Sequence, residues 1–286
     1  VTLRYKIGDN HSLYARWAQA FKAGGFDTGV TTLNRADPGP GFGFLPETAE
    51  TYELGSKGSL LDGRARYDIG LFQTVFNDLQ TTVATGIPED PFLNTNAGQQ
   101  RVRGVEFNFS AALSDQLTGS LAGAIMQGEF TDFIGGCTEQ EERDIGTSTS
   151  NCFETDDGDF LIDRGGEETA KTPDWKFILS LDYWMPLGDK FRLTSNFKGY
   201  YSDGYITDVN SFTKTNKYDS HADMNLNLGL GDLDESWEIS IFARNMLEAG
   251  PTYHPDFDVE ANGYQSVSLS PNNFRTYGVN FRYNFK

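Results

Sequence analysis

The sequence predicts an all-β protein, an antiparallel transmembrane β-barrel with about eleven strands in the chain. Three observations lead to this fold class. Aromatic residues reach 14% although hydrophobic residues make up only 38%, and there are 31 glycines. Many segments alternate between apolar and polar residues, which is the period of a β-strand. Short turns and long loops also follow each other in strict alternation along the chain.

Charge and hydropathy argue against other classes of protein. The formal net charge is −18 and the sequence pI is about 4.5, so no nucleic-acid partner is expected. The chain has no run of 18 apolar residues that could form a transmembrane helix. A barrel strand crosses a bilayer with about ten alternating residues, and its mean hydropathy stays low.

The last predicted strand shows the alternation clearly. In YGVNFRYNFK, every second residue from Tyr277 to Phe285 is aromatic or apolar, and the residues between them are polar or small. We expect lipid to cover the apolar face of such strands, including Phe177, Leu179, Leu181, Leu226, Leu228, Ile239 and Ile241. The patterns predict strands over residues 1–8, 12–21, 48–60, 64–82, 92–113, 117–130, 172–186, 190–202, 216–230, 236–246 and 272–285.

The connections between these strands fall into two classes. Short turns are expected at residues 8–11, 61–63, 114–116, 187–189 and 231–236, and long loops at 22–47, 83–91, 131–171, 203–215 and 247–271. Because the classes alternate, all short turns lie at one end of the sheet. That asymmetry is typical of bacterial outer-membrane barrels, whose short turns are periplasmic and whose long loops are extracellular. The C-terminus is then periplasmic.

The strand count suggests that the sheet continues outside residues 1–286. Eleven is odd, whereas bacterial single-chain barrels have even numbers of strands. An isolated sheet would also leave two edges with unpaired backbone groups. We therefore expect further strands before Val1.

Five segments in order along the chain resemble the C-terminal half of a TonB-dependent outer-membrane receptor. An aromatic strand runs into a Gly-Gly loop in SLYARWAQAFKAGGFDTG. Two barrel hairpins follow in PETAETYELGSKGSLLDGRARYDIGLFQTVFNDLQ and NAGQQRVRGVEFNFSAALSDQLTGSLAGA. The strand exit FARNMLEAGPTY and the closing strand YGVNFRYNF complete the series. The resemblance covers nearly the whole chain.

The resemblance implies a transport receptor rather than an enzyme, with no cofactor. Family members have a 22-stranded barrel, an N-terminal plug domain and a TonB box. Residues 1–286 would be the C-terminal half of such a barrel, without the plug domain and the N-terminal barrel half. The Gly-Gly loop looks most like that of receptors for iron complexes, which implies TonB-coupled uptake of an iron–siderophore complex. Two alternatives stay open: the same architecture importing a carbohydrate or cobalamin, and a passive or structural barrel.

The implied partners are the imported ligand, TonB through a region outside this sequence, and outer-membrane lipid and lipopolysaccharide. The barrel assembly machinery reads the C-terminal strand of such barrels, which usually ends on an aromatic residue. In this chain Phe285 is followed by Lys286.

Candidate ligand-binding residues lie in the predicted long loops, where an extracellular ligand is met first. Aromatic rings also form the interfacial girdle of barrels, and Tyr200 and Tyr201 are assigned to that girdle. Some polar residues are expected to face the lumen, where they either contact the ligand or form ion pairs with neighbouring strands. They are Arg192, Lys198, Asp219, Asp223 and Arg244. The loop candidates are Phe26, Arg35, Phe42, Phe44, Tyr205, Tyr253, His254 and Tyr264.

The loop at 131–170 contains twelve acidic and two basic residues. It is either simply solvated, or a Ca²⁺ site through Asp156, Asp157 and Asp159, or a barrier to anionic ligands. Its two cysteines, Cys137 and Cys152, are the only ones in the chain. They form either a local disulfide, which suits an oxidising compartment, or two free thiols.

Overall fold

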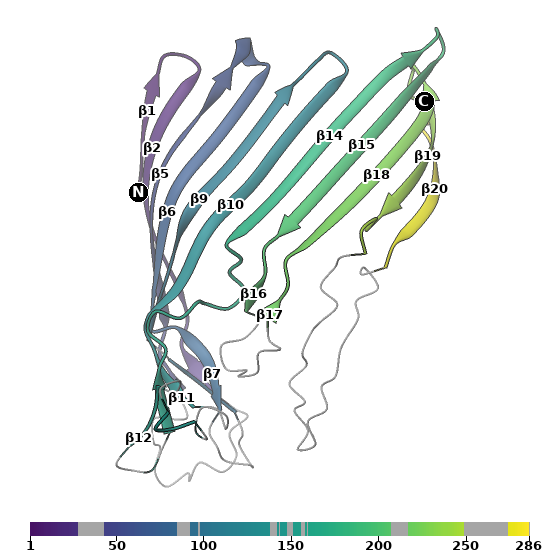
Figure 1. The fold of residues 1–286 in the computed structure, drawn as a ribbon. Coiled ribbons are helices and arrows are strands. Elements are labelled where there is room, and N and C mark those ends of the chain that lie inside the picture. Colours follow the sequence, from purple (N-terminus) through teal and green to yellow (C-terminus); the bar gives the residue numbers. More distant parts are fainter. Residues whose placement is uncertain are drawn as a thin grey trace.

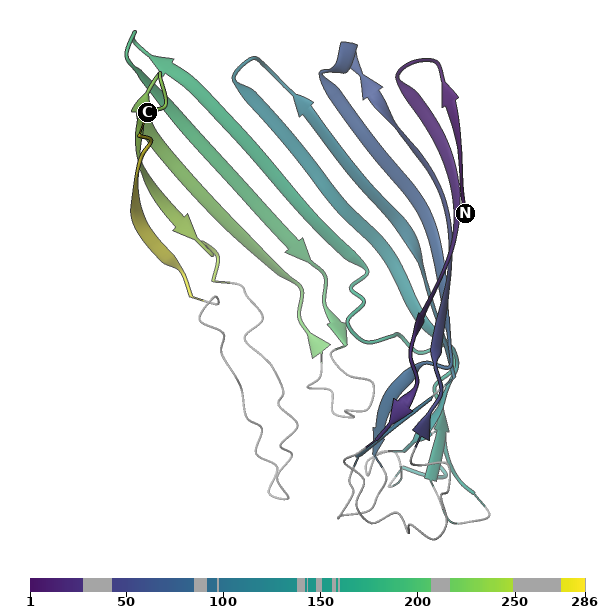
Figure 2. The ribbon, with the colours of Figure 1, turned by 180° about the vertical axis from the view of Figure 1, so that it is seen from behind.

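The computed structural model describes residues 1–27, 43–84, 92–96, 98–137, 142, 144–147, 151–155, 158, 160–206, 217–248 and 274–285. Eleven long strands form one curved antiparallel sheet, and each strand pairs with the next long strand in the sequence (Figure 1). The predicted all-β fold class and strand count are therefore confirmed. The sheet is open, with β1 and β20 at its two edges (Figure 2).

The strands of this main sheet match the predicted segments closely. They are β1 Thr2–Ile7, β2 His11–Lys22, β5 Glu47–Leu60, β6 Ala65–Asn77, β9 Gln99–Ala112, β10 Leu117–Asp132, β14 Trp175–Leu187, β15 Phe191–Ser202, β18 His221–Asp232, β19 Trp237–Arg244 and β20 Thr276–Tyr283. Among the described residues, no helix is long and apolar enough to cross a bilayer.

Small sheets occupy the long connections and lie at the same end of the main sheet (Figure 1). Strands of two to five residues carry too little alternation to be predicted separately, and residues 80–82, 92–96 and 217–218 were included in longer predicted strands. The small sheets are β3 Gly25–Phe26 with β4 Gly43–Phe44, β7 Gln80–Ala84 with β8 Phe92–Asn96, β16 Tyr205–Ile206 with β17 Lys217–Tyr218, and the three-stranded sheet of β11 Ile134–Gly136, β13 Phe160–Asp163 and β12 Cys152–Glu154.

Three predicted strands are in fact broken. The strand predicted over 216–230 is divided into β17, which ends at Tyr218, and β18, which begins at His221. The strand predicted over 64–82 ends at Asn77, because Asp78 has a φ of 54° and turns the chain away from the main sheet. The strand predicted over 92–113 is divided at Gly98, which has a φ of 48°. A Cβ at Gly98 would lie 1.5 Å from the carbonyl oxygen of Asp132, so the backbones approach too closely for a side chain.

The two faces of the main sheet differ in chemistry, as the alternation predicts. On one face, Leu181, Phe197 and Leu226 are neighbours across three adjacent strands. On the other face, the next residues along, Asp182, Asn196 and Asn227, are neighbours in the same way. Of the residues expected to face lipid, Leu179, Leu228, Ile239 and Ile241 are exposed, and Phe177, Leu181 and Leu226 are half-buried among their neighbours.

The apolar face has a visible limit near the long-loop end. One row across the strands is apolar: Leu54, Leu71, Val105 and Ile125. The next row is mixed: Trp17, Tyr52, Gln73, Arg103 and Gln127. The row after that contains charge: Gln19, Glu50, Val75, Arg101 and Glu129. Since charged side chains are costly in hydrocarbon, the mixed row marks the edge of the lipid-facing band.

Candidate ligand entry site

The first two long connections are locked together at the long-loop end. The side-chain amide of Gln80 donates hydrogen bonds to the carbonyl oxygens of Ala23 and Leu45, both at 2.9 Å. The amide of Asn96 donates to the carbonyl oxygens of Leu45 at 2.9 Å and Asp78 at 2.7 Å. Short polar side chains thus satisfy loop backbone groups that have no strand partner, which fixes the β3–β4 hairpin beside β8.

The β3–β4 hairpin brings two of the predicted ligand-binding residues together. Phe26 pairs with Gly43, and Phe44 pairs with Gly25. A Cβ at Gly25 would lie 2.8 Å from the Phe44 ring, so this ring lies flat on the glycine. The Phe26 side chain is 71% exposed and therefore presents its ring to solvent. Arg35 and Phe42, predicted for the same loop, lie outside the described residues.

A second aromatic group stands on the hairpin that joins β15 to β18. Tyr205 and Tyr218 are paired across β16 and β17, with ring centroids 5.1 Å apart. Burial raises the pKa of both phenols, and each is raised further by a nearby tyrosine, Tyr200 for Tyr205 and Tyr205 for Tyr218. Both phenols therefore stay neutral and can donate hydrogen bonds at neutral pH.

Tyr200 does not belong to the lipid-facing girdle. It is paired with Asp223 on β18, and its ring centroid is 5.6 Å from that of His221. Successive residues of a strand point to opposite faces, so Tyr200 faces the lumen and Tyr201 faces outward. The predicted candidates Tyr253, His254 and Tyr264, and the Ca²⁺ candidates Asp156, Asp157 and Asp159, lie outside the described residues. No group of three metal-binding side chains occurs in the part of the chain that the structure describes.

The third long connection is partly folded and attached to the wall. Phe130 and Phe133 pack with ring centroids 4.9 Å apart, and Phe133 is only 1% exposed. The backbone N–H of Thr169 donates to the carbonyl of Gly128 at 3.1 Å. The described part of this acidic loop is therefore not simply solvated.

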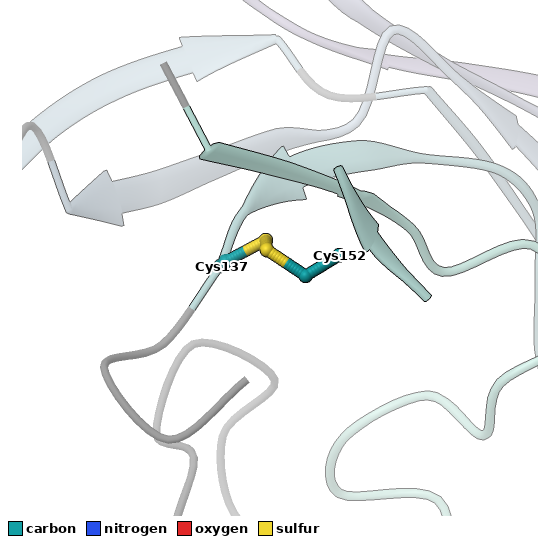
Figure 3. Close-up of a disulfide and its surroundings, with 2 residues drawn as sticks. All are labelled: Cys137 and Cys152. Atoms are coloured by element: carbon teal, nitrogen blue, oxygen red, sulfur yellow. A yellow bond between two sulfur atoms is a disulfide. The ribbon is translucent and has the colours of Figure 1, made fainter. Parts of the chain in front are cut away.

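Cys137 and Cys152 are joined by a disulfide within the third connection, with their Cα atoms 6.0 Å apart (Figure 3). The sequence left open whether the two cysteines form a disulfide or are free thiols, and the structure contains the disulfide. Cys137 follows β11 directly and Cys152 is the first residue of β12. The bond therefore links the two outer strands of the three-stranded sheet covalently.

The lumen-facing polar residues are paired at the short-turn end. Arg192 contacts Glu235 and also Glu238, at 3.6 Å from the latter. Arg282 lies 3.7 Å from the same Glu238. The predicted pairing of opposite charges across strands thus applies to Arg192. It does not apply to Lys198 and Arg244, for which the described residues supply no ion pair.

One lumen-facing cluster was missed by the sequence analysis. The hydroxyl of Tyr14 donates to the carboxylate of Glu53 at 2.5 Å, and its ring lies across Gly55. These residues line a recess of about 390 Å³ that also includes Asp68, Glu106 and Lys176. Their positions on the polar face of five strands were the signal that could have identified them.

Comparisons with known proteins agree with this geometry. A family model described as TonB dependent receptor-like, beta-barrel matches residues 1–246. The metal-pseudopaline receptor CntO of Pseudomonas aeruginosa is 31% identical over 113 residues, which are 40% of this chain and 14% of that receptor.

Solved structures show the same fold at low sequence identity. The ferric yersiniabactin uptake receptor FyuA from Yersinia pestis has a TM-score of 0.70 and 16% identity, over 100% of this chain and 37% of that one. The siderophore receptor PiuA from Acinetobacter baumannii has a TM-score of 0.62 and 17% identity, over 98% of this chain and 34% of that one. The chain thus spans well under half the length of these relatives. It belongs to the TonB-dependent receptor-like β-barrel family, a family of outer-membrane transport receptors.

Proposed function

We propose that this protein is an outer-membrane receptor that imports a metal complex, with an iron–siderophore complex as the leading class of ligand, and that uptake is coupled to TonB. The observation that carries the proposal is the arrangement of the long-loop end. Two aromatic hairpins, with Phe26 and Phe44 on one and Tyr205 and Tyr218 on the other, lie at the long-loop end of the main sheet. Aromatic rings with a few polar groups suit a conjugated chelate that also bears hydrogen-bonding atoms.

The names of the relatives support this class of ligand. CntO is a metal-pseudopaline receptor, FyuA a ferric yersiniabactin uptake receptor and PiuA a siderophore receptor. In our proposal further contacts come from the first and the last long loop, through Arg35, Phe42, Tyr253, His254 and Tyr264. A carbohydrate or cobalamin ligand, or a passive barrel, is the competing outcome.

The proposed orientation follows from the two ends of the sheet. We place the long loops outside the cell and the short turns in the periplasm, so that the mixed row at Arg103 meets the outer leaflet with its lipopolysaccharide. In the same proposal β1 and β20 pair with further strands of a 22-stranded barrel, because unpaired backbone groups cost several kcal/mol each in hydrocarbon. A plug domain and the TonB contact would belong to the rest of the polypeptide, and the assembly machinery would recognise the C-terminal strand.

Growth of a strain that lacks only this gene tests the proposal. Under iron limitation, we expect growth on one or more ferric siderophores to be lost and then restored by the full-length gene. Restoration by a gene carrying both Phe26→Ala and Tyr205→Ala should be weaker than by one carrying Phe153→Ala, which removes an exposed aromatic ring from the third loop. A growth defect on a carbohydrate or cobalamin, with normal use of all ferric complexes, would contradict it.

A further inference from the structure

The lumen face contains a second recess, in the long-loop half of β15, β18 and β19. It has a volume of about 470 Å³. Its polar lining includes Lys198, Asn225, Asn227, Ser240, Arg244 and Asn280. Arg244 is the last residue of β19, and β18 begins only four positions before Asn225. Both Asn225 and Arg244 therefore lie near the end of the wall from which the long loops extend.

Asn225 stands between the two cations of the recess. Lys198 is its direct partner on β15. On the other side, the side-chain oxygen of Asn225 accepts a hydrogen bond from the backbone N–H of Asn245 at 3.0 Å, which holds the end of β19 against β18. Phe242 pairs with Asn227, so Arg244, two residues further along β19, lies on the same inner face as Asn225 and Lys198. The two cations therefore stand on β15 and β19, with β18 between them.

Neither cation has a carboxylate partner among the described residues, unlike Arg192 and Arg282, which share Glu238. The one acid in the lining, Asp182, accepts a hydrogen bond from the Asn196 amide at 2.6 Å, and Asp223, beside the lining, accepts one from the Asn225 amide at 3.0 Å. The guanidinium carbon of Arg244 lies 4.8 Å from the centre of the Phe242 ring. Stacking on the ring orients the guanidinium and leaves its N–H groups available for an acceptor.

The Phe242 ring is itself fixed in place. It lies across Gly278 on β20, where a Cβ would be 2.3 Å from the ring. The base of the recess is therefore rigid, and Arg244 is supported before any ligand arrives. A preorganised guanidinium loses less conformational freedom on binding than a solvated one.

We propose that this recess binds the carboxylate or other oxyanion groups of the imported ligand, which makes the ligand an anionic, oxygen-rich metal chelate. The proposal rests on the proposed function and names its class of ligand. A guanidinium binds a carboxylate through two parallel hydrogen bonds, and the ammonium of Lys198 supplies a second positive charge. The carboxamides around them supply additional donors. In a chain with a net charge of −18, unpaired cations on the inner wall would select for such a ligand.

The test uses the purified full-length receptor and calorimetric titration with ferric citrate, with a neutral ferric trihydroxamate and with metal-free citrate. Lys198→Gln and Arg244→Gln should each weaken ferric citrate binding about tenfold, and the double variant more strongly. The affinity for the neutral complex should change by less than about twofold in the same variants. Arg66→Gln is the matched control, because it removes the same charge from the same face at the short-turn end of β6.

The other outcomes overturn either the inference or the proposed function, and the probes tell the two apart. An equal loss in Arg66→Gln would mean that the overall field of the wall, and not this recess, attracts the anion. An equal loss for the neutral complex, or a lower thermal midpoint with unchanged affinity, would assign the two cations to the fold; the proposed function would then stand. A receptor that binds metal-free citrate through these cations but supports growth on no ferric complex would keep the recess and refute the proposed function. Binding of none of the three probes would overturn the inference.

Discussion

The two faces of the main sheet are made from alternate residues of the same strands, yet they are stabilised in different ways. The outer face, at Leu181, Phe197 and Leu226, is a row of apolar side chains across three strands. The inner face, at Arg192 and Glu238, is a network of charges and amides. The role of a residue therefore depends mainly on which face of the sheet its side chain points to, and this face alternates from one residue to the next. A substitution should have opposite consequences at two adjacent positions.

Arginine substitutions at adjacent residues of β18 should give the largest difference. Leu228→Arg places a charge on the lipid-facing side between Leu226 and Leu230, at a cost of about 2–4 kcal/mol near the bilayer midplane. Asn227→Arg, on the inner face, should change stability by less than about 1 kcal/mol. Urea unfolding of the full-length receptor in lipid vesicles measures both. Equal losses would mean that the assignment of the faces is wrong.

Removing the disulfide should affect neither face of the wall. The bond closes a loop with a sequence separation of 15 residues, which contributes about 3 kcal/mol to local order in the loop-entropy view. In Cys137→Ser with Cys152→Ser, we expect faster proteolysis within 131–171 and an unchanged unfolding transition of the wall. Mass spectrometry without reduction provides the control on the unmodified receptor, and free thiols there would contradict the pairing.

Glycine-to-alanine substitutions compare the packing of the two faces and leave their charge unchanged. Gly55→Ala on the inner face would place a Cβ 2.3 Å from the Tyr14 ring. The ring cannot move without breaking its hydrogen bond to Glu53, so we expect a loss of about 1–3 kcal/mol. Gly199→Ala on the outer face meets its nearest atom at 3.4 Å and should be close to neutral. The same vesicle unfolding assay compares them, and a neutral Gly55→Ala would show that the Tyr14 contact is not rigid.

The smallest effect is expected where the outer face leaves the lipid. Val75→Arg adds a charge in the row of Glu50 and Arg101, beyond the mixed row. Near the interface such a substitution costs only about 0–1 kcal/mol. Comparing the loss of stability in Val75→Arg and Leu228→Arg in one assay therefore shows how deep each position lies in the bilayer. A loss as large as that of Leu228→Arg would move the edge of the lipid-facing band towards the loops.

The sequence predicts the wall well because lipid on one side and polar groups on the other enforce the alternation in strands of eight or more residues. It predicts the ends of strands less well. The break at Asp78 depends on a left-handed backbone conformation that its local sequence does not require, whereas Gly98 was a usable signal. The site was only partly predictable, because partners such as Tyr205 and Tyr218 are brought together by a hairpin of two-residue strands. The assignment of Tyr200 to the lipid-facing girdle was wrong, although adjacent residues such as Tyr200 and Tyr201 must point to opposite faces of a strand.

The order of strands in the main sheet also has a consequence for how the wall forms. In the part of the chain that the structure describes, each long strand of the main sheet pairs with the long strands before and after it in the sequence. Short turns let each hairpin close with little loss of chain entropy. The long connections, such as the one between Asp132 and Trp175, add only a logarithmic cost for their length. Assembly can therefore proceed hairpin by hairpin from either edge, with each completed hairpin serving as the template for the next.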